Sequence, residues 1–280
     1  MSKVRFKELI KCGITGHSGT IGKNLIRANK KIKFIYFKGN IINKNQVENW
    51  IKNNNFEYLI HLAAIVPIRE VNRNKRKAFK VNTIGTSNLV RAIIKIDNNI
   101  KWLFFASTSH VYSSSKKKIK EDFPIKPISY YGRTKFLAEE KLKILKKKEI
   151  KICIGRIFST ANNSQRNNYL VPDLKKKIKK IRNTIVLENL NHFRDFISIQ
   201  DIAKILIHML KNNVNGIFNI CSSKKVRLTE IAKIISNYYK KKITLKLNKK
   251  PSYLIGNNQK LKKIFKKKIN KDLKKIILDD

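Results

Sequence analysis

The chain has 280 residues, of which 42% are hydrophobic, enough to bury the core of one large or two modest domains. Lys and Arg number 64 against 18 Asp and Glu, so the formal charge is +46, and nucleic acid, acidic membranes and anionic substrates come first as partners. Only 12 of the basic residues are Arg, however, whereas specific phosphate and base recognition prefers the Arg fork. We therefore interpret the charge as a compositional bias and expect no specific nucleic-acid binding.

Membrane insertion and disulfide chemistry are also disfavoured. No uncharged apolar run approaches the roughly 20 residues needed to cross a bilayer, and the charged segment 1–9 contains no apolar stretch of an export signal. Cys12, Cys153 and Cys221 lie in apolar runs at spacings that fit neither a metal site nor a disulfide framework. We expect a soluble, cytoplasmic protein with buried reduced thiols, no metal and no transmembrane segment.

Short β-branched runs alternate with longer segments of helical spacing along the chain. This alternation predicts an α/β fold, a Rossmann-type doubly wound parallel sheet with helices on both faces. In chain order, the predicted strands are Leu9–Thr15, Ile32–Phe37, Tyr58–Leu62, Trp102–Ala106, Ile152–Ile157 and Gly216–Ile220, and the predicted helices are Gln46–Lys52, Arg69–Ile96, Tyr130–Lys148 and Gln200–Lys211.

The alternation loosens after Phe158. A helix near Val171–Ile181, a short strand at Ile185–Leu187 and a mixed C-terminal part indicate a smaller lobe at the carboxyl edge of the sheet. We predict a dinucleotide-binding domain over residues 1–158, completed by a returning segment at about 196–220, and a substrate-binding lobe from 159–195 and 221–280.

A glycine-rich turn follows the first predicted strand directly. In the segment Thr15–Gly22, Gly16, Gly19 and Gly22 allow a tight turn, a close backbone approach to a pyrophosphate, and close packing of the next helix. Such a turn can be a mere strand-to-helix connector, but its place after the first strand favours dinucleotide binding.

A second group of polar residues lies about a hundred residues further on. Ser107 and Thr108 end a predicted strand, and Tyr131 and Lys135 stand one helical turn apart on the same helix face. The Lys ammonium, helped by a cationic nicotinamide, is expected to lower the pKa of the Tyr phenol so that it exchanges a proton with a carbinol oxygen. A strand-end hydroxyl, from Thr108 or Ser107, would hold that oxygen.

Together these motifs resemble the extended short-chain dehydrogenase/reductases of the NAD-dependent epimerase/dehydratase family, whose members act on nucleotide sugars. The similarity runs nearly from end to end. Beside the glycine turn, it extends over His61–Ala64, Val81–Leu89, Pro127–Gly132, Arg194–Ala203 and Gly216–Ile220.

The resemblance implies a set of site residues. Thr108, Tyr131 and Lys135 would form the catalytic triad, and Arg194 would meet the phosphates of the sugar nucleotide, although an ion pair with Asp195 or Asp201 is the alternative for that guanidinium. Substrate binding would also involve Thr108, Ser109 and Ser159. The implied contacts to NAD or NADP come from Gly16, Ser18, Gly19, Thr20, Ile21, Gly22, Lys38, Asn40, Leu62, Ala63, Ala64, Asn82, Tyr131 and Lys135.

The chain departs from the family pattern at the adenosine end of the cofactor. One strand-helix unit before Ile32–Phe37 is missing or compressed, and no carboxylate stands where the adenosine ribose would be held. A carboxylate there favours NAD, whereas a cation tolerates the extra phosphate of NADP. Lys38 therefore favours NADP weakly, with an ordinary exposed lysine as the alternative.

Two further departures concern the substrate. Ser109 and His110 occupy the positions where the related 4,6-dehydratases have Asp and Glu, so we expect no dehydratase; His110 is either a second acid or base or a polar neighbour. Ser159 stands where the family usually has Asn.

Several functions stay open at this point. A 4-keto reductase, which needs only a hydride and the Tyr131 proton, is the leading hypothesis, and a nucleotide-sugar 4-epimerase is the alternative. A catalytically silent dinucleotide binder and a nucleic-acid or membrane-surface binder are more remote. The resemblance also implies a homodimer formed through the two long helices.

Overall fold

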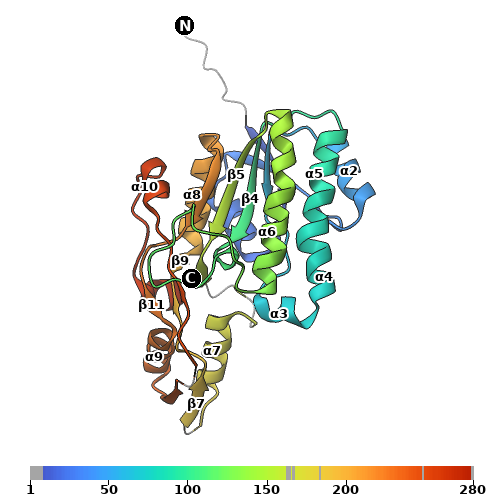
Figure 1. Cartoon of the computed structure of the whole chain (residues 1–280). Helices are drawn as coiled ribbons and strands as arrows, with labels where there is room; N and C mark the ends of the chain where they lie inside the picture. The colour runs from blue at the N-terminus through green and yellow to red at the C-terminus, as the bar shows by residue number, and fades with distance from the viewer. Residues whose placement is uncertain (1–8, 162–164, 166–167, 183, 248, 279–280) are drawn as a thin grey trace.

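Six parallel strands form the central sheet of the structure, a computed structural model that describes residues 9–161, 165, 168–182, 184–247 and 249–278 (Figure 1). Each predicted strand is present with nearly the predicted bounds, so the α/β fold is confirmed. The strand order is β2 (Ile32–Tyr36), β1 (Ile10–Thr15), β3 (Tyr58–His61), β4 (Trp102–Thr108), β5 (Lys151–Ile157) and β10 (Gly216–Ile220).

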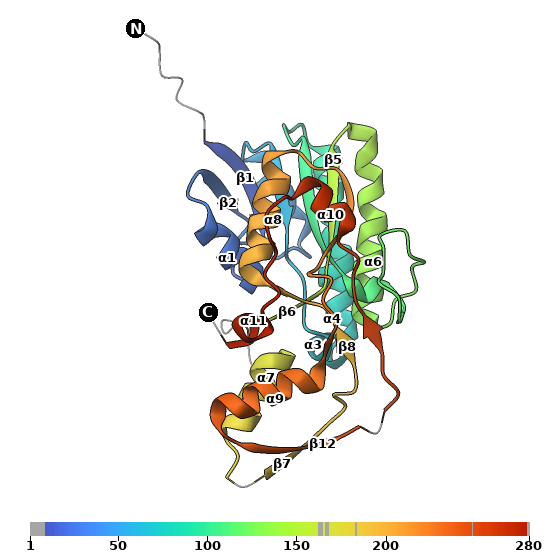
Figure 2. The same cartoon turned by 90° about the vertical axis from the view of Figure 1, so that its left-hand side faces the viewer.

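Helices cover both faces of this sheet (Figures 1 and 2). On one face α1 (Thr20–Ala28) packs against α8 (Ile199–Lys211), and on the other α5 (Gly85–Lys95) packs between α2 (Lys44–Lys52) and α6 (Tyr130–Leu142). Parallel strands with helices on both sides must be apolar on both faces, which explains their almost unbroken hydrophobic sequences.

Strand β4 illustrates this double burial. Trp102 and Phe104 belong to the core cluster on the α1 and α8 side, whereas Leu103 and Phe105 belong to the cluster on the α2, α5 and α6 side. Successive side chains of a strand point to opposite faces, so one heptapeptide contributes to two cores.

The predicted long helix Arg69–Ile96 is interrupted. It consists of α3 (Ile68–Arg73), α4 (Lys75–Phe79), a π-helical turn at Lys80–Ile84, and α5. The break falls at Asn74, whose backbone leaves the helical region and whose side chain accepts a hydrogen bond from the Lys77 amide at 2.8 Å. Asn satisfies a free helix amide well, which favours a new start there over continuation.

Strand β2 is an edge of the sheet. Within the described residues no further strand pairs with its outer side, so the predicted loss of one strand-helix unit agrees with the structure. The predicted helix Tyr130–Lys148 is α-helical to Leu142 and continues as 3₁₀ turns over Lys143–Lys148.

The remaining chain builds a smaller lobe below the sheet in Figure 2. Its core clusters around Leu174, Ile178, Ile231 and Ile235. The elements are β6 (Ser159–Ala161), α7 (Leu170–Lys179), β7 (Thr184–Glu188), β8 (Phe193–Arg194), β9 (Phe196–Ser198), β11 (Val226–Arg227), α9 (Leu228–Tyr239), β12 (Lys242–Lys246), β13 (Tyr253–Leu254) and α11 (Leu273–Leu278). In contrast, α10 (Gln259–Ile264) packs against β10 of the central sheet, and Leu261 belongs to the core cluster on the α1 and α8 side.

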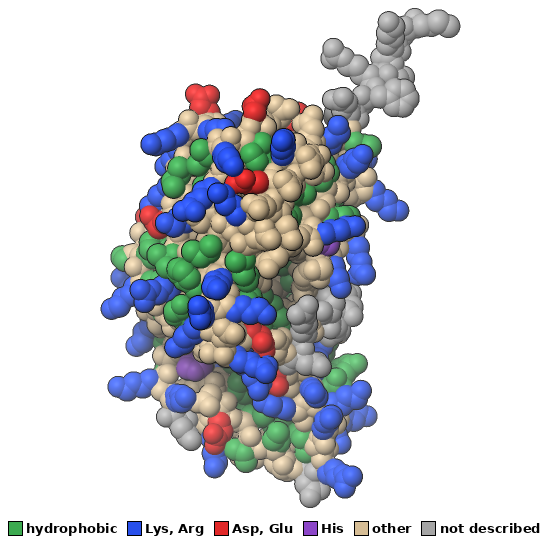
Figure 3. Space-filling view, turned by 90° about the vertical axis from the view of Figure 1, so that its right-hand side faces the viewer, with side chains coloured by type: hydrophobic (Ala, Val, Ile, Leu, Met, Phe, Trp, Pro, Cys, Tyr) green, Lys and Arg blue, Asp and Glu red, His purple; other side chains and the backbone are tan. Residues whose placement is uncertain are grey.

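The surface is rich in basic side chains, as the composition predicts. On the face shown in Figure 3, Lys and Arg side chains are scattered instead of gathered into one patch. None of the described helices is both long and apolar enough to span a membrane. All three cysteines are free and buried, as predicted, and burial raises the pKa of the Cys12 thiol, which keeps it protonated.

Candidate active site

The turn between β1 and α1 needs glycine for two physical reasons. Gly16 has φ +73°, which L side chains rarely adopt, and a Cβ there would lie 2.6 Å from the Ala63 amide nitrogen. A Cβ on Gly22 would lie 2.6 Å from the Gly16 carbonyl oxygen. Helix α1 begins after Gly19 with no side-chain cap and no acidic residue in its first turn. Its first amides are therefore available to a ligand, and the turn fits a pyrophosphate.

A buried histidine fixes the strand end beside this turn. His61 Nε2 lies 2.9 Å from the Thr86 hydroxyl, which itself donates to the Asn82 carbonyl oxygen, so Nε2 is the protonated nitrogen. Nδ1 then accepts from the Thr15 hydroxyl at 2.6 Å, and Thr15 Oγ1 accepts from the Ala63 amide at 3.3 Å. Burial lowers the pKa of His61 to about 3, which keeps the ring neutral. This chain of bonds holds Ala63 against Gly16.

Asn82 connects the segment after β3 to helix α6. Its side-chain oxygen accepts from the Ile65 amide at 2.7 Å, and its amide nitrogen lies 3.1 Å from Thr134 Oγ1, which donates to the Tyr131 carbonyl oxygen. The side chain is fully buried and both ends of its amide are used within the chain. In the structure, Asn82 therefore holds the segment after β3 against helix α6, and its side-chain amide is bonded to other residues of the chain.

The predicted catalytic residues do come together. Helix α6 begins at Tyr130 because Ser129 caps it, accepting a hydrogen bond from the Gly132 amide at 3.0 Å. This places the Tyr131 hydroxyl beside Thr108 at the end of β4. Lys135 lies one turn further along α6 and is buried, with 1% of its surface exposed.

Burial is the largest cause of the pKa shifts of Tyr131 and Lys135. Burial raises the pKa of the Tyr131 phenol above its usual range, although the hydrogen bond with Thr108 opposes this. Burial also lowers the pKa of Lys135 to about 7, and its ammonium lies 4.0 Å from the Phe105 ring centroid. Desolvation is the largest cause of both shifts in the chain by itself, and the expected lowering of the tyrosine pKa, which includes the charge of a bound nicotinamide, stays a prediction.

A buried ion pair supports this part of α6. Arg156 on β5 donates to both carboxylate oxygens of Glu139, at 2.8 and 3.2 Å, and also to the Tyr112 hydroxyl at 2.8 Å. Ser107 donates to the same carboxylate, so of the two candidate strand-end hydroxyls only Thr108 stays available to a substrate. Sequence reasoning missed Glu139; its place one turn beyond Lys135 on the same helix was the available signal.

Arg194 lies in β8, and none of the described carboxylates forms an ion pair with it. Its guanidinium donates to the Phe193 and Ser252 carbonyl oxygens and to the Ser252 hydroxyl. The Asp195 carboxylate, in contrast, accepts four hydrogen bonds from Ser222, Ser223 and Gly256. The ion-pair alternative for Arg194 is therefore wrong, and burial lowers the pKa of this guanidinium to about 10. A half-buried cation with only neutral partners fits an anionic ligand.

The segment that would contact the adenosine of a dinucleotide cofactor has a basic composition. No Asp or Glu occurs anywhere in residues 9–47, which contain eight Lys and Arg. Tyr36 ends β2 with 39% of its surface exposed, and the His17 ring lies 4.9 Å from its ring centroid. Lys38 is exposed, whereas the Asn40 side chain is used locally to accept from the Ile42 amide.

The other predicted contacts lie around these groups. Ser18 is exposed in the glycine turn, while Thr20, Ile21, Leu62 and Ala64 are half-buried beside it. Ser109 is buried in the 3₁₀ turn after β4, and Ser159 is half-buried in β6, where it pairs with Phe196.

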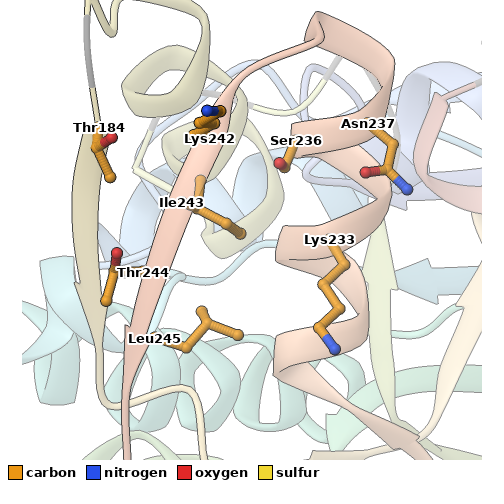
Figure 4. A pocket seen from close by; sticks show the side chains of 8 residues that line it. All are labelled: Thr184, Lys233, Ser236, Asn237, Lys242, Ile243, Thr244 and Leu245. Atoms are coloured by element: carbon orange, nitrogen blue, oxygen red, sulfur yellow. The ribbon is translucent and has the colours of Figure 1, made fainter.

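A separate hollow of about 550 Å³ lies at the far end of the smaller lobe, between α9 and the β7–β12 pair (Figure 4). Lys233 and Lys242 are its only ionisable lining residues among the eight shown. Its lining residues include no tyrosine and no glycine turn, so the active-site candidate stays at the carboxyl edge of the sheet.

Comparisons with known proteins agree with this geometry. Residues 12–221 match the NAD dependent epimerase/dehydratase family. The chain is 29% identical to GDP-6-deoxy-D-talose 4-dehydrogenase of Aggregatibacter actinomycetemcomitans (84% of this chain, 82% of that protein) and 28% identical to UDP-glucose 4-epimerase of Mycoplasma genitalium (92% and 84%). Its fold matches the structure of RMD from Pseudomonas aeruginosa complexed with NADPH, with a TM-score of 0.86, 17% identity and 96% of both chains covered.

The parallel sheet and the order of its motifs define an extended short-chain dehydrogenase/reductase. The chain belongs to the NAD dependent epimerase/dehydratase family.

Proposed function

We propose that this protein reduces a 4-keto, nucleotide-activated sugar, with Tyr131 as the proton donor. The observation that carries the proposal is the group of buried Thr108 and Lys135 with half-buried Tyr131, which stands at the same sheet edge as the uncapped Gly19 turn. The relatives named above act, by their names, on a GDP-sugar and a UDP-sugar, and both names refer to position 4 of the sugar.

Each part of the site has a separate role in the proposed reaction. The glycine turn and the first amides of α1 hold the pyrophosphate of a nicotinamide dinucleotide, which when bound supplies the hydride. Tyr131 donates its hydroxyl proton to the keto oxygen as that oxygen becomes an alcohol, and Thr108 orients the phenol through their hydrogen bond. Lys135, when protonated, stabilises the phenolate that remains. Arg194 binds the diphosphate of the sugar nucleotide through a guanidinium that has no carboxylate of its own.

We further propose NADPH as the preferred cofactor. A ribose carrying a 2′-phosphate needs cations and no carboxylate at the end of β2, and residues 9–47 contain no acidic residue. Lys38 is exposed just beyond β2 and free of any resolved ion pair among the described residues.

The second candidate is a 4-epimerase. It uses the same Tyr131 and Lys135 but oxidises and then reduces the same carbon, so it consumes no cofactor overall. The similarity to UDP-glucose 4-epimerase over 92% of this chain favours it.

One assay separates the two candidates. The purified full chain is mixed with NADPH or NADH and with GDP-, UDP- and dTDP-linked 4-keto sugars, and absorbance and sugar products are followed. A reductase oxidises the cofactor in proportion to product, faster with NADPH than with NADH. Isomerised sugar without cofactor loss would identify an epimerase and overturn the reductase proposal.

Replacement of Tyr131 by Phe tests the proton donor. We expect kcat to fall by about 100-fold or more, because general acid catalysis contributes on this scale. Binding of NADPH, followed by its fluorescence, should stay within about threefold, since the phenol hydroxyl contributes little to dinucleotide affinity. A variant with full activity would refute the mechanism.

A further inference from the structure

His110 occupies a place in the site that the proposed reaction does not yet use. It lies in the 3₁₀ turn Ser109–Val111 directly after Thr108, and its ring centroid is 6.1 Å from that of Tyr131. The charge of Arg194 also reaches it, contributing to a lowered His110 pKa. The ring is thus near both the proton donor and the cation that binds phosphate, and the sugar of a nucleotide sugar must lie between those two groups.

The backbone of His110 is held firmly against α6. Its carbonyl oxygen accepts from the Ile128 amide at 3.1 Å, and any Cβ on Gly132 would collide with that same oxygen. Glycine at position 132 therefore allows the helix to approach the turn closely. The imidazole has little freedom to move relative to Tyr131.

Hydrogen bonding assigns the tautomer. Nδ1 of His110 lies 3.2 Å from Ser129 Oγ, which already accepts from the Gly132 amide. The Ser129 hydroxyl proton has no other acceptor among the described residues, and we therefore assign it to the bond with Nδ1. The ring proton of a neutral imidazole then resides on Nε2. This nitrogen has no hydrogen-bond partner in the described part of the chain, and the residue is half-buried.

We propose that His110 is a specificity-determining residue whose Nε2–H donates a hydrogen bond to an oxygen of the substrate sugar. This inference rests on the proposed function. Burial lowers the pKa of His110 to about 4, so the neutral ring that this contact uses is the form present at neutral pH.

The test measures binding, so it does not depend on turnover. Calorimetric affinities of the full-length protein are measured for UDP-glucose against UDP and for GDP-mannose against GDP, with wild type, His110→Leu and His110→Gln. We expect His110→Leu to weaken the better-bound nucleotide sugar about 10-fold while the matching nucleoside diphosphate changes less than about twofold, because only the sugar contact is lost.

His110→Gln should restore sugar affinity to within about threefold, since its amide places a donor near the position of Nε2. The matched control is His208→Leu in α8, far from the site, which should change neither affinity. If His110→Leu weakened the binding of the nucleotide sugar and of the nucleoside diphosphate equally, or changed neither affinity, the role of His110 would be overturned. The proposed function would not be affected by that result. If wild type binds NADPH but no nucleotide sugar, the proposed function falls, and this inference with it.

Discussion

Lys135 shows what burial does to a charged residue in this site. The side chain has 1% of its surface exposed, and burial brings its pKa from the usual 10.5 to about 7. The carboxylate of Glu139 favours the charged form, but that carboxylate is already bound to Arg156. At neutral pH the lysine is therefore divided between its two protonation states.

This pKa predicts a pH-dependent stability cost. Between pH 7 and 10.5 the unfolded chain carries the Lys135 proton and the folded chain does not, so the free energy of unfolding rises with pH across this window. Below about pH 7 the penalty is complete and constant. Lys135→Met should therefore raise the free energy of unfolding by about 1–4 kcal/mol at about pH 6, while activity is lost.

Urea unfolding of wild type and Lys135→Met from about pH 6 to about pH 10 measures this effect. The advantage of the variant should shrink as the pH rises. Lys141→Met, an exposed position on the same helix, is the control and should show no such trend. A difference that is constant over the whole range would contradict the lowered pKa.

At the scale of elements, the proposed dinucleotide binding depends most on the connection of β1 to α1. Gly16 combines a positive φ with a backbone contact to Ala63, and the contact depends on the His61 bonds behind it. Gly19 lacks both constraints: its φ is −75°, and the nearest atom to an added Cβ is the Gly16 carbonyl oxygen at 3.3 Å.

Replacing Gly16 by Ala should lower the free energy of unfolding by about 1–3 kcal/mol, because the new Cβ strains φ and pushes the segment at Ala63 away. The same displacement should weaken NADPH binding by about 10-fold or more, measured by fluorescence. Gly19→Ala is the control for stability and should cost less than about 0.5 kcal/mol. Equal losses for the two variants would show that the backbone constraint at Gly16 is not the cause.

At the scale of the whole molecule, the +46 charge has a physical consequence although it specifies no partner. With 64 basic and 18 acidic residues, at least 46 cations lack a carboxylate of their own, and on the face shown in Figure 3 they are dispersed. Like charges confined to a compact fold repel one another, and salt screens this repulsion.

Added salt should therefore stabilise this protein. We expect the urea midpoint at neutral pH to increase when NaCl is raised from about 0.02 M to about 0.5 M, since the Debye length falls from about 20 Å to about 4 Å. A lower midpoint at high salt would mean that attractive ion pairs outweigh the repulsion. Choline chloride in place of NaCl separates screening from specific sodium binding.

Much of the fold was accessible from the sequence because its signals are local. Apolar runs of strand length, the glycine turn after the first of them, and the pair Tyr131 and Lys135 depend on residues within a few positions of one another. Those signals predicted the six strands, the α/β class and the composition of the candidate site. The break at Asn74 was missed because a single capping side chain outweighed the helical spacing around it.

The tertiary structure decided everything that depends on burial and on partners distant in sequence. It raised the pKa of the Tyr131 phenol and lowered that of the Lys135 ammonium, because desolvation is a property of packing and not of spacing. It left Arg194 without a carboxylate although Asp195 is its neighbour in the chain, and it brought His110 beside Ser129 across 19 residues. The sequence by itself determined which chemical groups this protein carries; only the folded chain determined which of them are charged, which are paired, and which remain available to a ligand.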